Sequence, residues 1–186
     1  FLPATAHAAV EILRRSGIEI EGKRAVVIGR SAVVGMPAAF LLVRENATVT
    51  VCHSRTRDLP RHVKDAEILV VAAGHPGLIR GEMLRRGAVV VDVGINVVDG
   101  ALVGDVDFES ARPVASAITP VPGGVGPLTN ALLLAHLVRA ALGQESRDEG
   151  AAGPKVAADA RVVPSRAPGT PGTTGAGTVA DRPVVT

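Results

Sequence analysis

The stretch RAVVIGRSAVVG, residues 24–35, places an apolar run of strand character before two glycines. Gly29, at the end of that run, permits a tight turn, and Gly35 lets a following helix begin close to the sheet. Backbone N–H groups between them, together with the helix dipole, favour a phosphate. In the full dinucleotide fingerprint, glycines would also stand at the positions of Ser31 and Val34. The pattern therefore indicates a nucleotide-binding turn, with an ordinary strand-turn-helix as the alternative.

Outward from this stretch, short β-branched runs alternate with helical patterns. Most of the runs lack polar alternation, which is typical of strands covered on both faces. Strands alternating with helices over short loops predict a parallel sheet. We therefore expect an α/β fold with a doubly wound parallel sheet of Rossmann type, whose ligands lie at the carboxyl ends of the strands. The expected strands are 24–28, 47–51, 67–72, 88–93 and 117–119, and the expected helices are 5–16 (N-cap Thr5), 37–45, 61–65, 81–86 and 128–142.

Composition changes sharply at Gly143. Every Leu, Ile, Phe and Met of the chain lies in residues 1–143, and residues 144–186 contain none. The segment APGTPGTTGAGT, residues 167–178, has only small or polar side chains, which bury too little apolar surface to offset the entropy of ordering. We therefore predict one NAD(P)-binding domain over residues 1–143 and a disordered low-complexity tail over residues 144–186, with a linker to a further domain as the alternative.

The whole-chain composition argues against several classes of partner. With 20 basic and 18 acidic residues and no Trp or Tyr, the chain lacks a basic stripe with aromatic residues for nucleic acid. Its apolar runs are too short for a membrane span. Cys52 is the only cysteine, so no intrachain disulfide is possible, a cytoplasmic location is expected, and a buried thiol is favoured over a nucleophile. Because the chain does not begin with Met, we expect it to be part of a longer protein.

The sequence CHSRT, residues 52–56, follows the second expected strand. In dinucleotide sites, an acidic residue at this place bonds the ribose 2′-hydroxyl of NAD. Ser54 and Arg55 stand here instead, and an Arg fork pairs with a phosphate through two N–H groups. The segment therefore favours NADP over NAD, and a surface Arg on a loop is the alternative interpretation.

Three further loops follow expected strands and face the same edge of the sheet. Gly74 and Gly94 would let the backbone approach a cofactor closely. Asp92 is expected to accept hydrogen bonds from loop N–H groups. The string ITPVPGGVGP, residues 118–127, places three Pro and three Gly between a strand and the last helix. That composition predicts a rigid loop that exposes its backbone, and a functional role is favoured for it.

The remaining candidate groups have structural explanations. A turn followed by a helix N-cap accounts for Asp105 and Asp107. No Ser-centred nucleophile elbow is present. His136, within the apolar last helix, is expected to be packed or interfacial. The histidines show no metal-ligand spacing, so neither a metal site nor a catalytic residue is predicted among them: His7, His53, His62, His75 and His136.

Together, these motifs resemble the bifunctional methylenetetrahydrofolate dehydrogenase/cyclohydrolase family over roughly residues 1–143. Their order and spacing match throughout, and the string TPVPGGVGP is the most specific of them. The segments that carry the resemblance are 22–23, 25–31, 34–35, 52–56, 92–95, 104–106 and 118–129.

The resemblance implies the NADP-binding domain of a two-domain enzyme that oxidises 5,10-methylenetetrahydrofolate and then hydrolyses the methenyl product. It also implies a tetrahydrofolate substrate and a homodimer formed through the cofactor domain. By the same resemblance, the cofactor would be held by Gly29, Arg30, Ser31, Ser54, Arg55 and, beside the nicotinamide, Ile95. The cleft where folate meets the cofactor would be lined by Pro122, Gly123, Gly124, Val125 and Gly126.

Two departures from the family pattern bear on activity. The family's catalytic domain precedes this one and supplies a Tyr and a Lys, whereas this chain has no Tyr, and its Lys23 and Lys64 lie in other motifs. The family's Pro-Cys-Thr-Pro-x-Gly segment is replaced by PATAHA, residues 3–8. We therefore expect no turnover by this chain alone. The alternatives are a stand-alone, non-catalytic dinucleotide-binding module and the Rossmann domain of another NADP-dependent dehydrogenase, such as a shikimate-type enzyme.

Overall fold

A computed structural model describes residues 2–142 of the chain, and the predicted tail of residues 144–186 lies outside the described residues. Five strands form one sheet in the order β2-β1-β3-β4-β7, and all neighbouring strands are parallel. The topological switch point lies between β1 and β3, where the chain turns to build the second half of the sheet. The strands are β1 (Arg24–Ile28), β2 (Thr48–Cys52), β3 (Ile68–Val71), β4 (Val89–Asp92) and β7 (Ala117–Ile118).

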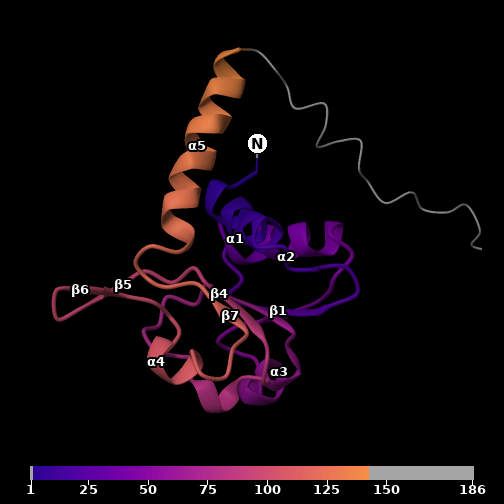
Figure 1. Cartoon of the computed structure of the whole chain (residues 1–186), viewed down its shortest axis with the longest axis vertical. Coiled ribbons are helices and arrows are strands. Elements are labelled where there is room, and N and C mark those ends of the chain that lie inside the picture. The colour runs from indigo at the N-terminus through magenta and orange to yellow at the C-terminus, as the bar shows by residue number, and fades with distance from the viewer. Residues whose placement is uncertain (1, 143–186) are drawn as a thin grey trace, which may run out of the picture. The chain divides into compact units, whose positions relative to one another are not determined.

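Helices cover both faces of this sheet, as the doubly wound prediction requires. Ala25 and Val27 of β1 pack into a core cluster with the first two helices, whereas Val26 and Ile28 pack into a second cluster with the third and fourth. Figure 1 shows α1 and α2 on one side of the sheet and α3 and α4 on the other. The helices are α1 (Ala4–Arg15), α2 (Gly35–Arg44), α3 (Leu59–Asp65), α4 (Phe108–Ala111) and α5 (Val125–Ala141), with a 3-10 turn η1 (Gly81–Met83).

Strand β2 lies at one edge of the sheet, and its burial differs from that of the inner strands. Exposed and half-buried residues alternate along it until Cys52, which is fully buried. Burial raises the pKa of the Cys52 thiol above its ordinary value. The expected buried thiol is therefore confirmed.

Several helical predictions differ from the structure in detail, and α2 and α3 each begin two residues earlier than expected, at Gly35 and Leu59. Thr5 is not an N-cap, because Pro3 occupies that position and Thr5 lies in the first turn of α1. The helical pattern at 81–86 produces only the short turn η1. Leu84 ends that turn in an extended conformation, which directs its side chain into the buried core.

The last helix begins three residues earlier than predicted, at Val125, and Pro127 lies in its first turn. A proline is tolerated there, because the N–H that it lacks would have no partner within the helix. His136 is buried on α5, and its Nε2 lies 3.3 Å from Nδ1 of His7 on α1, with the rings stacked. It is therefore a packed residue, as expected. No helix within residues 2–142 is long and apolar enough to cross a membrane.

An antiparallel hairpin, formed by β5 (Asn96–Val98) and β6 (Ala101–Val103), was not predicted. Its two turn residues, Asp99 and Gly100, both have positive φ, at 50° and 80°. These angles are typical of the type I′ turn that matches the twist of a hairpin, and Asp-Gly is a favoured sequence for it. The hairpin forms a separate two-stranded sheet beside the carboxyl end of β4.

Candidate functional site

The loops that follow β1 and β2 adjoin at the carboxyl edge of the sheet. The N–H of Gly29 donates to the carbonyl of Cys52 at 2.8 Å, which holds the first residue of one loop against the end of the neighbouring strand. Two groups of predicted cofactor residues are therefore close in the fold, although they are more than twenty positions apart in sequence. One group is Gly29, Arg30 and Ser31, and the other is Ser54 and Arg55.

Glycine is required at both ends of the turn after β1. Gly29 has a φ of +117°, and a Cβ there would lie 2.1 Å from the carbonyl oxygen of Ala72. A Cβ on Gly35 would lie 2.2 Å from the carbonyl oxygen of Gly29. The turn is therefore pressed against both the loop after β3 and the first turn of α2. This close packing is the role that the glycines of a dinucleotide-binding turn perform.

The side chain of Ser31 lies before α2 and bonds to the first backbone N–H groups of that helix. Its Oγ accepts hydrogen bonds from the N–H groups of Val34, at 3.1 Å, and Gly35, at 3.3 Å. The expectation that the N–H groups between Gly29 and Gly35 are available to a phosphate is therefore corrected for Val34 and Gly35, because these two N–H groups are already bonded within the protein. Ser31 and Arg30 are both exposed, and the hydroxyl hydrogen of Ser31 and the guanidinium of Arg30 can reach an anion.

The loop after β2 is a tight turn that exposes Ser54 and Arg55. The N–H of His53 donates to Oγ1 of Thr56 at 2.9 Å, and the N–H of Thr56 donates to the carbonyl of His53 at 2.8 Å. The N–H of Arg55 donates to Nδ1 of His53 at 3.1 Å. The N–H groups of His53, Arg55 and Thr56 are thus bonded within the turn, and the side chains of Ser54 and Arg55 are exposed to solvent.

A cavity of about 560 Å³ lies at the carboxyl end of β4, and all the predicted cleft residues line it together with Ile95. The phosphate-side residues of the β1 and β2 loops do not line it. The structure therefore divides the predicted site into a phosphate side and a cavity side. The cavity is lined by Thr5, Asp92, Val93, Gly94, Ile95, Leu102, Pro120, Val121, Pro122, Gly123, Gly124, Val125, Gly126, Pro127, Thr129 and Asn130.

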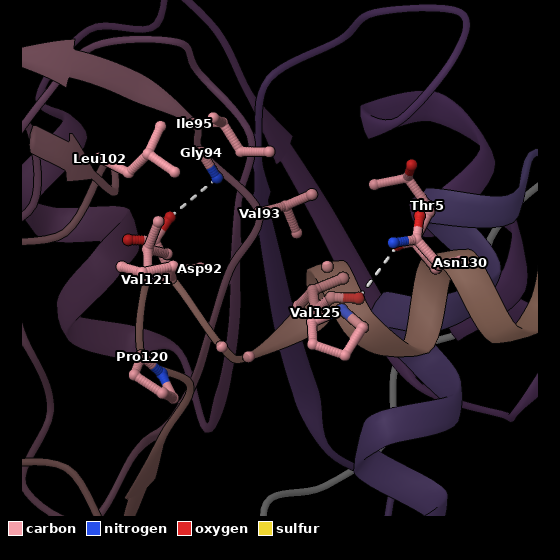
Figure 2. A pocket seen from close by; sticks show the side chains of 16 residues that line it. Thr5, Asp92, Val93, Gly94, Ile95, Leu102, Pro120, Val121, Val125 and Asn130 are labelled. Carbon is pink, nitrogen blue, oxygen red and sulfur yellow. Dashed lines mark hydrogen bonds between the residues drawn. The ribbon is translucent and has the colours of Figure 1, made fainter.

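Most of the cavity wall is apolar, and three polar side chains on it were not predicted as site residues, namely Thr5, Thr129 and Asn130. Figure 2 shows Thr5 of α1 and Asn130 of α5 beside each other at one end of the cavity. Thr129 is satisfied internally, because its Oγ1 donates to the carbonyl of Val125 at 3.0 Å. An apolar wall with a few polar groups suits a flat, mostly apolar ring system. A single Asn in an apolar helix carried no sequence signal for this role.

Asp92, at the end of β4, lines the cavity and accepts hydrogen bonds from three backbone N–H groups. One carboxylate oxygen accepts from the N–H of Gly94, at 2.9 Å, and from that of Asp105, at 3.1 Å, and the other accepts from Val106 at 2.9 Å. The first of these bonds is drawn in Figure 2. Burial raises the pKa of the Asp92 carboxyl, and the three N–H bonds oppose that shift. The expected bonding to loop N–H groups is confirmed.

Asp105 was expected to be a turn residue, and the structure corrects this. Its side chain is fully buried and accepts four hydrogen bonds. The donors are the N–H groups of Ala73 (2.6 Å), Gly74 (2.8 Å) and His75 (2.9 Å) and the side-chain amide of Asn96 (2.8 Å).

Glycine is required at position 94 because a buried carboxylate lies against it. A Cβ there would lie 2.2 Å from Cγ of Asp105, so its missing side chain makes room for that carboxylate. The predicted N-cap at Asp107 is confirmed, because its side chain accepts from the N–H of Ser110 at 3.3 Å.

Comparisons with known proteins match the described region. A family model described as tetrahydrofolate dehydrogenase/cyclohydrolase, NAD(P)-binding domain, matches residues 3–145. The bifunctional protein FolD of Halothermothrix orenii is 59% identical over 140 residues, which cover 75% of this chain and 50% of that protein. FolD of Parafrankia sp. is 59% identical over 143 residues, covering 77% and 52%. The chain therefore spans about half the length of the curated relatives it matches.

Two solved structures are similar in both fold and sequence. The bifunctional enzyme FolD of Campylobacter jejuni, a methylenetetrahydrofolate dehydrogenase/cyclohydrolase, has a TM-score of 0.76 at 48% identity, covering 77% of this chain and 51% of that one. The Trypanosoma brucei enzyme, solved with NADP cofactor and inhibitor, has a TM-score of 0.71 at 50% identity, covering 74% and 50%. In both cases the match is again to half of a longer chain.

Proposed function

The chain belongs to the tetrahydrofolate dehydrogenase/cyclohydrolase family, and from this premise we propose that it is the NADP-binding half of an enzyme that interconverts one-carbon derivatives of tetrahydrofolate. The proposed reactions are the oxidation of 5,10-methylenetetrahydrofolate and the hydrolysis of the methenyl product to 10-formyltetrahydrofolate. When bound, NADP accepts the hydride. We also propose a cytoplasmic location and a homodimer formed through this domain. The family match argues against the alternative of a shikimate-type dehydrogenase.

The observation that carries the proposal is the position of Arg55 beside the Gly29 turn. The hydrogen bond from Gly29 to Cys52 joins the two loops, and the loop after β2 contains no carboxylate before Asp58. A ribose that follows a phosphate held at the Gly29 turn would reach this loop. A guanidinium there favours a 2′-phosphate, whereas the acidic residue of NAD sites is missing. Ser54 would donate a second hydrogen bond to the same phosphate.

The cavity side would hold the nicotinamide ring and the facing part of the folate. Ile95 offers an apolar side chain to a flat ring, and the loop of residues 122–126 lines the same cavity. The one carboxylate in the lining, Asp92, already accepts three backbone hydrogen bonds. This half of the enzyme would therefore bind and orient both molecules. Proton transfer would fall to residues of the other half, because general acids and bases must lie within hydrogen-bond reach of the reacting atoms.

Separate fluorescence titrations of NADPH and of NADH into the 186-residue chain test the cofactor assignment. The chain has no Trp or Tyr, so the signal of the cofactor is clean. Loss of a charge-assisted hydrogen bond costs about 1.5–3 kcal/mol, so we expect Arg55→Ala to weaken NADPH binding about 10- to 100-fold. NADH binding should be unchanged. Arg57→Ala, two positions along the same loop, is the matched control.

Equal binding of NADH and NADPH by the wild-type chain would overturn the 2′-phosphate assignment, and so would an unaltered NADPH affinity of Arg55→Ala. The stand-alone module is tested by fusing the chain to the first half of the Halothermothrix orenii relative. Oxidation of methylenetetrahydrofolate by the fusion, with none by the chain alone, would support the enzyme. Cofactor binding by the fusion without turnover would favour the non-catalytic module.

A further inference from the structure

We propose that Asn96 is a positioning residue, which acts through Asp105 to hold Ile95 in place against the nicotinamide end of the cofactor. The inference rests on the proposed function, because it assigns Ile95 to the ring-binding side of the site. Asn96 does not line the cavity itself. Its effect would be exerted through the backbone that it anchors.

The first step is the exposure of Ile95. Its side chain is 71% exposed, although it borders the cavity (Figure 2). With so little of its surface covered, packing does not determine where this side chain lies. Its position is therefore set by the backbone on either side of it.

The second step is that both neighbours of Ile95 are anchored to buried carboxylates. On one side, the N–H of Gly94 donates to Asp92 at 2.9 Å. On the other side, Nδ2 of Asn96 donates to Asp105 at 2.8 Å. Both acceptors are buried in the domain, so the residues on either side of Ile95 are each held by a hydrogen bond to a buried carboxylate.

The third step concerns the hairpin that begins at Asn96. An isolated two-stranded hairpin is marginally stable in water, and β5–β6 is not part of the main sheet. The Asn96 side chain bonds to Asp105, which lies two residues beyond the end of β6, and so closes the base of the hairpin. The same carboxylate binds the N–H groups of the loop after β3. Asn96 therefore ties the hairpin, and Ile95 with it, to the domain.

This arrangement predicts an effect on one end of the cofactor only. The phosphate side, at Gly29 and Arg55, depends on bonds within the β1 and β2 loops, none of which involves Asn96. Loss of the Asn96 bond should therefore weaken a ligand that reaches Ile95. It should spare a ligand that stops at the 2′-phosphate.

Binding of two ligands to Asn96→Ala tests the inference: NADP, which reaches the cavity, and adenosine 2′,5′-bisphosphate, which does not. We expect the variant to bind NADP about tenfold more weakly, in line with the loss of one hydrogen bond to a charged group. Its affinity for adenosine 2′,5′-bisphosphate should stay within about twofold of the wild-type value. Asn96→Asp, which keeps the side-chain shape but places two carboxylates together, should weaken NADP at least as much.

Val97→Ala is the matched control, because Val97 is the next residue of β5 and its side chain is 72% exposed. It should bind both ligands as the wild type does. An unchanged NADP affinity of Asn96→Ala would overturn the inference, and so would an equal loss of both ligands. Failure of the wild-type chain to bind either ligand would instead count against the proposed function. In that case, hydrogen exchange of the free chain tests the Asn96–Asp105 bond. Faster exchange at the β5–β6 amides in Asn96→Ala would support the role of this bond in holding the hairpin. Unchanged exchange would overturn it.

Discussion

Carboxylates accept hydrogen bonds at both edges of the sheet, but they are buried at one edge and partly exposed at the other. At the carboxyl edge, Asp92 and Asp105 are buried, and together they accept hydrogen bonds from the loops after three strands. At the amino edge, Glu67 is half-buried. It accepts from the N–H of Arg24 at 3.1 Å and pairs with the side chains of Arg24 and Arg85, at 3.5 and 3.4 Å. Both arrangements satisfy backbone N–H groups, but only the first determines where the loops of a site lie.

The physical difference is access to water. When a buried acceptor is removed, its donors lose their partners and pay a desolvation cost of about 1–3 kcal/mol each. When a partly exposed acceptor such as Glu67 is removed, water can take its place, and ion pairs that are open to solvent contribute little. The carboxyl edge is therefore rigid at the places where a ligand would bind. The amino edge can vary with little consequence for the fold.

The largest effect that we expect is that of Asp105→Ala, which leaves three N–H groups and the Asn96 amide without their acceptor. We expect the free energy of unfolding to fall by about 3 kcal/mol, because water can reach part of the exposed loop after β3. Urea denaturation followed by far-UV circular dichroism measures this. A loss below about 1 kcal/mol would show that the carboxyl edge is no stiffer than the amino edge.

Gly94→Ala should have the next largest effect. The new Cβ would lie 2.2 Å from Cγ of Asp105, and relieving such an overlap costs about 2 kcal/mol. Gly74→Ala is an instructive control: a Cβ there meets open space, and only its φ of +69° opposes the change. The same urea denaturation should rank Gly94→Ala below Gly74→Ala in stability, and the reverse order would contradict the crowding argument.

Ser31→Ala removes the hydroxyl that accepts from the first N–H groups of α2 and should cost about 1 kcal/mol, the usual net value of an intramolecular hydrogen bond. Ser31→Thr keeps a hydroxyl and should restore most of that loss. Thermal unfolding of the three proteins in one buffer measures both changes. Equal stability of Ser31→Ala and the wild type would mean that water replaces the hydroxyl.

The smallest effect is expected for Glu67→Gln at the amino edge, and it should depend on pH. The N–H of Arg24 lowers the pKa of Glu67, helped by the charges of Arg24 and Arg85. A lowered pKa stabilises the fold above the unfolded-state value, and this contribution is lost as the pH falls through the folded-state value. Asp92 has a raised pKa and the opposite sign, so its contribution favours the fold at low pH and is lost as the pH rises.

Urea midpoints between about pH 3 and pH 7 separate these two contributions. Glu67→Gln should lose stability only at the upper end of that range and match the wild type at the lower end. A loss of the same size at every pH would show that Glu67 acts by packing and not by charge.

Much of the fold could be predicted because its signals are local. The apolar runs marked all five strands of the sheet, and the glycines at 29 and 35 marked the turn that the structure presses between two neighbours. The hairpin was missed although Asp99 and Gly100 carry its turn signal, because its strands are only three residues long.

The inner part of the site could not be predicted in the same way. The partners of Asp105 lie about thirty positions earlier in the chain and at Asn96, so its role exists only after the loops have been brought together. Asn130 had no signal for a similar reason, since its position beside Thr5 depends on how α5 packs against α1. Residues whose role depends on tertiary contacts are those that a linear pattern does not reveal.

The burial of Cys52 makes its thiol a probe of opening in the native state. A thiol reagent can reach this sulfur only when the packing around it opens, so the rate of labelling reports how often the native state opens around the end of β2. The carbonyl of the same residue receives the N–H of Gly29. A ligand bound at the Gly29 turn should therefore slow the labelling of Cys52. The labelling rate would then report ligand binding through the stability of the neighbouring strand end.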